Sequence, residues 1–188
     1  MNILWAARWE HDKNPEDFFA AIGQLETQGV EFGLNVIGER FADSPPIFDA
    51  ARKQFEPRIG RWGFQPSRAE YLATLQKSDV IVSTANHEFF GIAVVEAIAA
   101  GVRPLLPHRL SYPEILALKT DPSNRMFCYD GSVESLAERL FQLAEQFQNK
   151  DKWRDESSIA KELVAKYLWP NCAAMMDQEL SLACNSST

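Results

Sequence analysis

Short, almost continuous apolar runs recur along this 188-residue chain, and they constrain its fold more than any other feature. Ile3–Ala7 and Val80–Val82 lack the alternation of apolar and polar residues that a half-exposed strand shows. Such runs are typical of parallel strands that are covered on both faces. The six runs lie at Ile3–Ala7, Leu34–Gly38, Ile59–Phe64, Val80–Thr84, Val102–Pro107 and, more weakly, Met126–Tyr129.

Amphipathic helices are expected between these runs, and three of them have readable first residues. Asn14 can cap a helix whose first position is a proline. Ser67 and Glu70 have the spacing of a capping box, and Ser132 opens a helical pattern that continues to about Phe147. The alternation of strand and helix predicts an α/β fold, a Rossmann-like doubly wound parallel sheet flanked by helices.

The last part of the chain has a different pattern. Over Lys152–Ala183 it is helical only, and Pro170 should break this helical run near Trp169. We therefore expect one domain over residues 3–168 and a separate C-terminal helix over residues 169–184.

Composition argues against several classes of function. The formal charge of −7 disfavours a nucleic-acid-binding surface on this segment, because binding phosphates requires clustered Lys and Arg. The odd number of cysteines, three, and the lack of CxxC spacing favour free thiols in a reducing compartment. The first apolar run lacks the features of a signal peptide, and no stretch approaches the ~18 apolar residues of a membrane helix. We expect a cytoplasmic protein without a membrane span.

Polar residues with functional character follow the ends of the predicted strands. In an open α/β sheet, ligands bind at the carboxyl ends of the strands. Loops at strand ends are often polar for other reasons, so this distribution has an ordinary explanation as well. The residues concerned are Arg8, His11, Asp12, Lys13, Glu39, Arg40, Phe64, Gln65, Asn86, His87, Glu88, His108 and Arg109.

The segment His87–Gly101 carries the sharpest signal. Over Gly91–Ala100 every residue except Glu96 is small or apolar, which predicts a buried helix. The start of such a helix offers free amides and a positive dipole end to a diphosphate, and Gly91 lets the ligand approach closely. The Glu96 carboxylate needs a partner and leans toward this end, where it and Glu88 could accept hydrogen bonds from sugar hydroxyls. The alternative is that Glu96 pairs with an arginine and Glu88 is solvated.

Arg8 and Lys13 form a second candidate element. Both could reach one anion and stabilise the charge that develops on a departing phosphate group. The alternative is that they are ordinary surface cations paired with Glu10 and Asp12. His87 is expected to position a ligand by hydrogen bonding. The sequence contains no DxD or HxxxH pattern, so no metal site is expected.

The spacing of Glu88 and Glu96 resembles the E-x7-E element of family-4 retaining glycosyltransferases, which have the two-domain GT-B fold. Arg8 and Lys13 resemble the diphosphate-binding pair of that family. The segment Val36–Glu39 resembles its glycine turn after the second strand. The resemblance implies that the chain is one half of a GT-B fold, the nucleotide-sugar-binding half.

Within this family, four blocks resemble the group of tRNA-queuosine mannosyltransferases and their bacterial relatives. These blocks are Trp9–Lys13, Ser83–Ala85, His87–Gly91 and Tyr112–Ile115. The resemblance implies GDP-mannose as the donor, transfer of mannose with retention of the anomeric configuration, and an acceptor such as queuosine in tRNA. It implies no cofactor and no metal. The residues themselves leave the base, the sugar and the acceptor open.

The resemblance also implies roles for individual residues. Arg8, Lys13 and Glu88 would act in catalysis, Arg8 and Lys13 on the diphosphate and Glu88 on sugar hydroxyls. Glu96 would bind the ribose, and the turn at Trp62–Phe64 would border the base. The donor-binding set is Gly38, Phe64, His87, Phe90, Gly91, Ile92 and Glu96.

The chain departs from this family in one large respect, because the N-terminal domain that carries the acceptor site is missing. The resemblance implies that the helix over residues 169–184 crosses back to that domain. We expect as partners a nucleotide sugar, that domain and, through it, tRNA, and we expect this half to be inactive alone. Two other functions remain open: a non-catalytic nucleotide-binding or regulatory domain, and a nucleotide-sugar epimerase of the same architecture.

Overall fold

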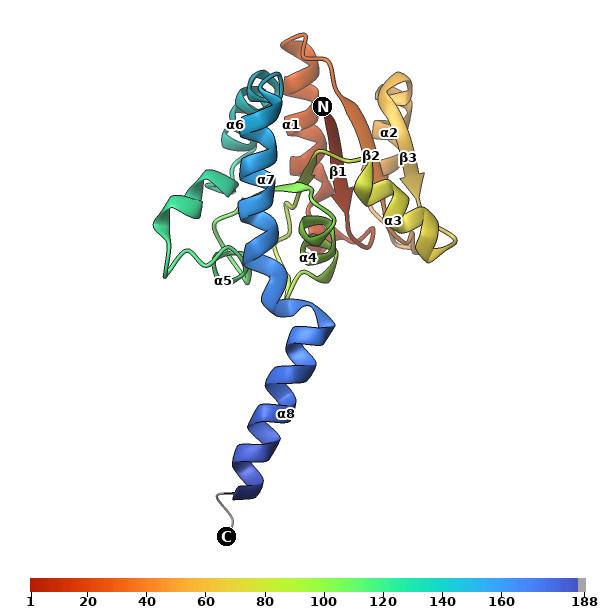
Figure 1. The fold of residues 1–188 in the computed structure, drawn as a ribbon. Coiled ribbons are helices and arrows are strands. Elements are labelled where there is room, and N and C mark those ends of the chain that lie inside the picture. The colour runs from red at the N-terminus through yellow and green to blue at the C-terminus, as the bar shows by residue number, and fades with distance from the viewer. Residues whose placement is uncertain (186–188) are drawn as a thin grey trace.

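The computed structural model describes residues 1–185 and shows an α/β protein with helices on both faces of one parallel sheet (Figure 1). Within those residues, six strands lie in the order β3-β2-β1-β4-β5-β6, and their pairings are parallel. Each of the predicted apolar runs forms a strand, so the doubly wound sheet is confirmed. The strands are β1 (Asn2–Ala6), β2 (Gly33–Ile37), β3 (Ile59–Gly63), β4 (Val80–Val82), β5 (Arg103–Pro107) and β6 (Cys128–Tyr129).

The order of the strands reverses beside β1, which lies between β2 and β4. Ile3 pairs with Leu34 on one side and with Val80 on the other. The connections that follow β1 and β4 therefore lead to opposite halves of the sheet. Open α/β sheets bind ligands in the crevice that such a reversal creates at the carboxyl ends of the strands.

Helices cover the sheet in two groups. One face carries α1 (Pro15–Thr27), α2 (Ile47–Gln54) and α6 (Val133–Gln146). The other face carries α3 (Arg68–Gln76), α4 (Ile92–Ala99), α5 (Tyr112–Ile115) and α7 (Lys150–Val164). Short 3-10 helices lie at His11–Lys13, Glu56–Arg58, Pro122–Phe127 and Ala165–Tyr167.

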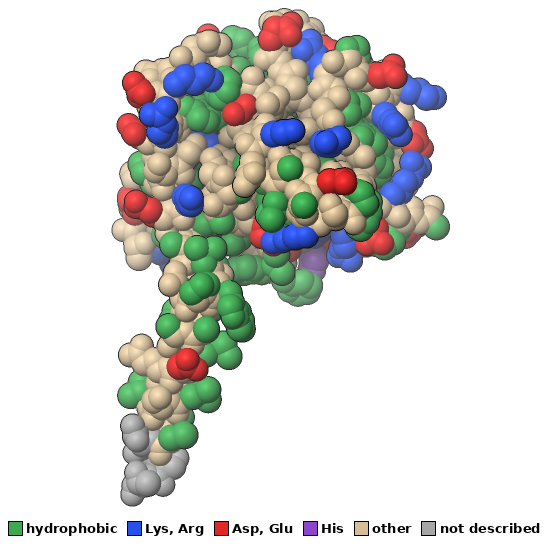
Figure 2. All heavy atoms as spheres, turned by 45° about the vertical axis from the view of Figure 1, so that its right-hand side comes forward, with side chains coloured by type: hydrophobic (Ala, Val, Ile, Leu, Met, Phe, Trp, Pro, Cys, Tyr) green, Lys and Arg blue, Asp and Glu red, His purple; other side chains and the backbone are tan. Residues whose placement is uncertain are grey.

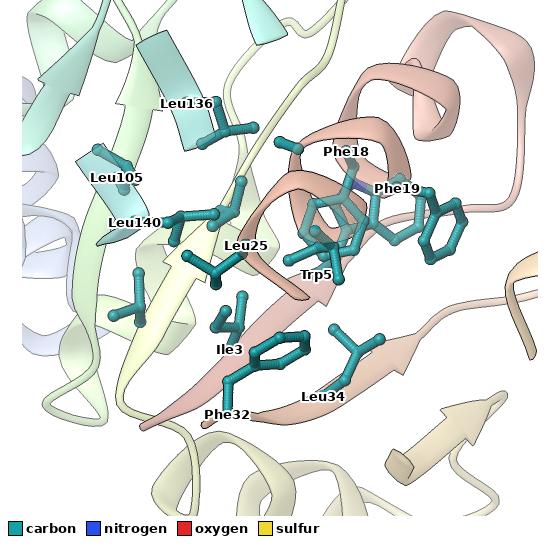
Figure 3. Packing of buried hydrophobic residues seen from close by; sticks show 14 of the residues in the cluster. Ile3, Trp5, Phe18, Phe19, Leu25, Phe32, Leu34, Leu105, Leu136 and Leu140 are labelled. Carbon is teal, nitrogen blue, oxygen red and sulfur yellow. The ribbon is translucent and has the colours of Figure 1, made fainter. Parts of the chain in front are cut away.

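Side chains of β1 alternate between these two groups, as the pleat of a strand requires. Ile3 and Trp5 pack in the core on the side of α1, whereas Leu4 packs on the side of α4. The Trp5 ring lies 6.0 Å from the ring of Phe18 (Figure 3). It lies 5.7 Å from the ring of Phe48, and all three side chains are buried. Burial of one large apolar side chain contributes about 2 kcal/mol. This cluster fixes β1, whose carboxyl end carries the candidate site.

The predicted helix starts are confirmed. Asn14 adopts a left-handed conformation with a φ of 50°, and its side chain accepts a hydrogen bond from the Asp17 amide at the start of α1. Ser67 caps α3, and Ser132 caps α6, each through its side chain. The sequence pattern did not predict α2, because the position before it is Pro46, which offers no capping side chain.

The chain leaves the helical path at Leu168 and continues as α8 (Trp169–Asn185), which extends away from the body of the molecule (Figure 1). The break expected near Trp169 is confirmed, and Pro170 lies in the first turn of α8, where its missing amide proton is tolerated. Apolar side chains, Met175 among them, are exposed along α8 (Figure 2). That α8 crosses to another domain stays a prediction. Among the described helices, none is both long enough and apolar enough to cross a membrane.

Candidate functional site

A cavity of about 460 Å³ opens at the carboxyl ends of β1, β2 and β3. It is lined by residues 6–8 at the end of β1, 37–39 at the end of β2 and 64–67 after β3, together with Arg68 and Tyr71 of α3 and Ala93 of α4. Its volume falls within the range of about 300–1,000 Å³ that is usual for small-molecule sites. Three residues of the predicted catalytic and donor-binding sets line it, Arg8, Gly38 and Phe64, as do Glu39 and Gln65 from the wider group of polar strand-end residues.

Gly38 allows the ends of β1 and β2 to approach each other at this cavity. A Cβ atom at this position would lie only 1.7 Å from the Ala7 carbonyl oxygen, so no other residue fits without moving the backbone. The segments that follow β1 and β2 remain hydrogen-bonded to each other. The Ala7 amide donates to the Ile37 carbonyl, and the Trp9 amide donates to the Glu39 carbonyl. Gly38 therefore shapes the cavity floor through its backbone.

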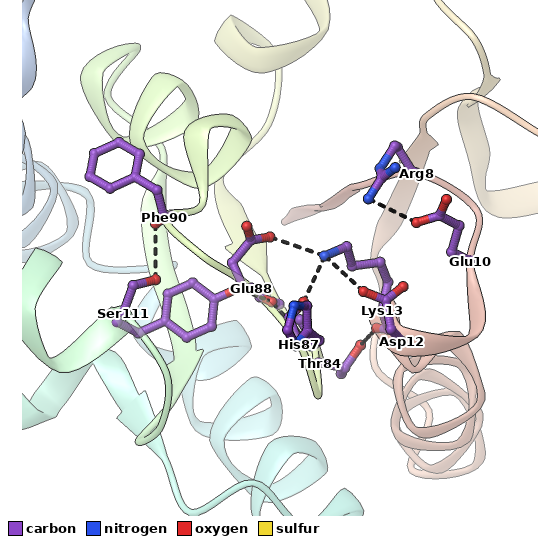
Figure 4. Close-up of polar contacts among 12 residues, drawn as sticks. Arg8, Glu10, Asp12, Lys13, Thr84, His87, Glu88, Phe90 and Ser111 are labelled. Carbon is purple, nitrogen blue, oxygen red and sulfur yellow. Dashed lines mark hydrogen bonds and ion pairs between the residues drawn. The ribbon is translucent and has the colours of Figure 1, made fainter.

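Lys13 lies at the centre of a polar cluster beside this cavity (Figure 4). Its side chain is only 8% exposed, and its Nζ donates to the His87 carbonyl at 2.7 Å. The same Nζ lies 3.2 Å from Oδ2 of Asp12 and 3.4 Å from Oε2 of Glu88. The structure thus brings together two of the predicted catalytic residues, Lys13 and Glu88, from loops that follow different strands.

Thr84 helps to hold these two loops in place. Its hydroxyl donates to the Lys13 carbonyl at 2.9 Å and accepts a hydrogen bond from Nε1 of the buried Trp5 at 3.2 Å. The Asn86 amide also donates to the Asp12 carbonyl at 2.8 Å. Sequence reasoning did not select Thr84 as a site residue, because a threonine at a strand end carries no signal of its own. Its role follows from contacts that join distant parts of the chain.

Both predicted cations have carboxylate partners, as the alternative interpretation supposed. Arg8 pairs with Glu10 at 3.0 Å, and Lys13 pairs with Asp12. The Arg8 side chain is 59% exposed, so it can leave Glu10 at little cost. Lys13 is not a surface residue, because its side chain is buried, whereas its partners Asp12 and Glu88 are partly exposed.

A second, much smaller cavity of about 20 Å³ adjoins the first. Lys13, Glu88 and Gly91 line it, and Ala7 and Ala93 line both cavities. The space beside Arg8 and the space beside Lys13 and Glu88 are therefore neighbours.

Gly91 occupies the N-cap of α4, as predicted, with a φ of 90° that favours glycine. A Cβ atom there would also lie 3.3 Å from the Tyr112 ring. The amides of the first turn of α4 have no partner within the helix, which suits an anion. The Phe90 carbonyl just before it accepts a hydrogen bond from the Ser111 hydroxyl at 3.0 Å (Figure 4).

The expectation that this helix is buried on all sides is wrong for its first turn. Ile92 is 65% exposed, and Phe89 just before the helix is 86% exposed. These apolar side chains lie at the rim, where the sheet no longer covers them. His87 is exposed as well, with its ring 4.8 Å from that of Phe89, and the Phe90 ring lies 5.0 Å from that of Tyr167. His87, Phe90 and Ile92 line neither cavity among the described residues.

Both carboxylate oxygens of Glu96 are hydrogen-bonded to side chains of α3. Nη2 of Arg68 lies 2.7 Å from Oε1, and the Tyr71 hydroxyl donates to Oε2 at 2.7 Å. Burial and the neighbouring Glu96 carboxylate raise the pKa of Tyr71 well above its ordinary value. Glu96 does pair with an arginine, as the alternative supposed, whereas Glu88 is paired with Lys13 and not merely solvated. The role of Glu96 toward a ligand stays a prediction. Glu96 itself lines neither cavity, but Arg68 and Tyr71 line the larger one.

Two other cations at strand ends bind groups of the protein itself. The Arg109 guanidinium donates to the carbonyls of Thr84 and Ala85 at 2.9 and 3.0 Å, and so supports the loop after β4. Arg40 forms a bidentate pair with Asp49 of α2. Among residues 1–185, no three or more His, Cys, Asp or Glu side chains are grouped so that they could hold a metal ion.

The chain matches known proteins in sequence. The sequence model of the family described as "Glycosyl transferases group 1" matches residues 2–158. Over 176 residues the chain is 33% identical to the tRNA-queuosine alpha-mannosyltransferase of Drosophila melanogaster, covering 89% of this chain and 44% of that protein. It is 24% identical over 175 residues to the GDP-mannose:cellobiosyl-diphosphopolyprenol alpha-mannosyltransferase of Xanthomonas oryzae pv. oryzae, covering 89% of this chain and 43% of that protein. The chain thus spans less than half the length of these curated relatives.

Solved structures share the fold. Sucrose-phosphate synthase from Thermosynechococcus elongatus superposes with a TM-score of 0.74 at 18% identity, covering 100% of this chain and 46% of that chain. At this level of identity the likeness concerns the fold alone.

Proposed function

The chain belongs to the group 1 family of glycosyltransferases, and on that premise we propose that it binds the nucleotide-sugar donor from which the enzyme transfers a hexose. The observation that carries this proposal is the pair of adjoining cavities at the reversal of the sheet. One cavity has Arg8 in its wall, and the other has Lys13, Glu88 and the start of α4 at Gly91. Together they offer cations and helix amides to a diphosphate and a carboxylate to a sugar.

The donor would lie in the larger cavity and extend over the residues that line the smaller one, which has room for only about one water molecule. Its diphosphate would rest between Arg8, Lys13 and the first turn of α4, and Glu88 would accept hydrogen bonds from hydroxyls of the transferred sugar. The nucleoside would occupy the larger cavity, with Phe64 at the base and Glu96 at the ribose. Gly38 would allow the backbone to come close to the ligand.

The chemistry would consist of a displacement at the anomeric carbon. The bond from this carbon to the diphosphate oxygen breaks, the acceptor hydroxyl forms the new bond, and its proton passes to the departing diphosphate on the same face. Retention of configuration follows from this same-face path. Lys13 and Arg8 would stabilise the charge on the diphosphate, and Glu88 would hold the sugar in position.

We extend the proposal to mannose as the sugar and GDP-mannose as the donor. Both relatives described above are mannosyltransferases by name, and the name of one contains GDP-mannose. The name of the other points to queuosine in tRNA as the acceptor. The net charge of −7 supports an acceptor site outside this chain, in the part of the relatives that it does not span. We also propose a cytoplasmic location, because the cysteines of the chain are free thiols. This location agrees with a tRNA acceptor.

Calorimetric titration of the chain with GDP, UDP and GDP-mannose tests the proposal. We expect binding of GDP and GDP-mannose in preference to UDP, and a loss of about tenfold in affinity in Glu96→Ala. A preference for UDP would retain donor binding but contradict GDP-mannose. Failure of all three ligands to bind at millimolar concentration would contradict donor binding by this chain.

A further inference from the structure

Glu96 has a second side-chain partner in addition to the arginine of its ion pair. Its carboxylate is 28% exposed, and each of its oxygens accepts a hydrogen bond at 2.7 Å from a different side chain. Arg68 and Tyr71, which donate these bonds, lie one turn apart on α3 and belong to the wall of the larger cavity. Ala93, one turn before Glu96 on α4, lies in the same wall. The carboxylate thus lies at the border of the cavity, and Tyr71 is its firmer partner, because the Arg68 side chain is 63% exposed.

The arrangement leaves a definite acceptor capacity on Glu96. An ionised carboxylate has about four lone-pair positions, two on each oxygen. Arg68 occupies one position on Oε1, and Tyr71 occupies one on Oε2. One position on each oxygen therefore remains for a ligand. Two adjacent acceptors in a fixed plane match two vicinal hydroxyls, each of which donates one hydrogen bond.

Both partners of Glu96 act as hydrogen-bond donors at neutral pH. Arg68 carries a permanent positive charge, and its hydrogen bond with Glu96 raises its own pKa further. Tyr71 keeps its proton, because burial and the carboxylate raise its pKa. Both are therefore donors at neutral pH, and Glu96 can offer its remaining lone pairs only as an acceptor.

We propose that Arg68 and Tyr71 are positioning residues: through their hydrogen bonds they orient the Glu96 carboxylate toward the ribose hydroxyls that the proposed function assigns to it. The inference rests on the proposed function, because it deepens the donor site described above. It predicts that binding of the ribose hydroxyls depends on Arg68 and Tyr71, two residues that the sequence patterns did not indicate.

A ligand comparison tests the role of Tyr71. The chain and its Tyr71→Phe variant are titrated calorimetrically with GDP and with 2′,3′-dideoxy-GDP, and with UDP and 2′,3′-dideoxy-UDP as a second pair. We expect the unchanged chain to bind the ribonucleotide about tenfold more tightly than the dideoxy form, and Tyr71→Phe to reduce this ratio to about threefold. Affinity for the dideoxy form should stay the same, because Glu96 has no hydroxyl to bind there.

Matched variants separate a positioning role from a structural one. Tyr129→Phe removes another buried hydroxyl, which donates to the Ser83 carbonyl at 2.9 Å, and should leave the ratio unchanged. Arg68→Met should reduce the ratio as Tyr71→Phe does. An equal loss of affinity for both ligands in Tyr71→Phe would show a structural role, and tighter GDP binding in Arg68→Met would show that Arg68 competes with the ligand.

The outcomes distinguish this inference from the proposal on which it rests. If the unchanged chain binds neither nucleotide pair, donor binding itself fails. If it prefers the ribonucleotide and Tyr71→Phe retains the full preference, only the positioning role of Tyr71 is wrong.

Discussion

Nζ of Lys13 lies 3.4 Å from Oε2 of Glu88, although 75 positions separate the two residues in the sequence. One follows β1 and the other follows β4, and these strands are neighbours at the point where the sheet reverses. The pair therefore joins the two halves of the sheet at the place where a ligand binds in this type of fold. A cation for phosphate and a carboxylate for hydroxyls are held together before any ligand arrives.

Replacement of Lys13 by methionine removes the ammonium group and keeps most of the side-chain length. We expect Lys13→Met to weaken GDP binding at least about tenfold, because the diphosphate loses a charged donor in a buried setting. Calorimetry measures the effect, and thermal melting confirms that the variant folds. Lys53→Met, at an exposed position on α2, is the control and should bind GDP as the unchanged chain does. Unaltered GDP affinity in Lys13→Met would remove Lys13 from the site.

The close approach of the chain at Gly38 predicts a large effect of a single methyl group. Gly38→Ala should lower the free energy of unfolding by about 3 kcal/mol, because its Cβ would overlap the Ala7 carbonyl oxygen. Gly29→Ala is the matched control: its φ of 73° strains alanine, but nothing lies within 4 Å of the added atom. We expect only about 1 kcal/mol there. Urea unfolding of both variants checks the difference, and equal losses would contradict a steric cause at Gly38.

Which features could be predicted from the sequence depends on how far apart the interacting residues lie. Asn14 and Ser67 cap helices through residues three positions away, so their patterns are visible in the sequence. The pairing of Glu96 with Arg68 spans 28 positions, and only the packing of α4 near α3 creates it. The need of Glu96 for a partner was predictable from its apolar surroundings. The identity of that partner was not.

The rim of the site shows a second limit. The apolar segment that begins at Gly91 predicts a helix correctly, but apolar composition cannot tell a buried turn from a turn at the edge of the sheet. Ile92 and Phe89 are exposed, whereas Gly91 between them is buried beside the Tyr112 ring of α5. The exposure of a side chain at this edge of the sheet depends on the elements around it. It cannot be predicted from the sequence of one segment.

A buried ion pair between β5 and α7 supports the face of the sheet that carries α4. Nε of Arg103 lies 2.8 Å from Oε2 of Glu156, and these side chains are 2% and 13% exposed. Glu156→Ala should lower the free energy of unfolding by about 3 kcal/mol, because it leaves a guanidinium buried without its counter-charge. Asp151→Ala, which removes an exposed partner of Arg154 on the same helix, is the control and should cause no measurable change. Chemical denaturation measures both, and similar effects would argue against burial as the cause.

Buried tyrosines predict how stability depends on alkaline pH. Burial raises the pKa of Tyr112 to about 12 and also raises the pKa of Tyr129 and of Tyr71. The unfolded chain loses these protons near pH 10 and the folded protein only at higher pH, so their contribution is complete below about pH 10. Above it, the free energy of unfolding should fall by about 1.4 kcal/mol per pH unit for each tyrosine. Urea unfolding between pH 9 and pH 11 measures this slope (about one unit to either side of the ordinary tyrosine pKa).

Tyr112→Phe isolates the contribution of one tyrosine. This variant should show a shallower fall above about pH 10 than the unchanged chain, because one ionisable group is gone. An identical slope in both proteins would mean that other groups control alkaline unfolding.

The most direct test of the account is to map where GDP binds. Amide chemical shifts of the isotope-labelled chain are followed by NMR as GDP is added. We predict that the largest changes fall on residues 7–8, 38–39, 64–68, 71, 91 and 93, which line the two cavities. Changes confined to α8 or spread evenly over the surface, or no change at millimolar GDP, would contradict the proposal that these cavities form the donor site.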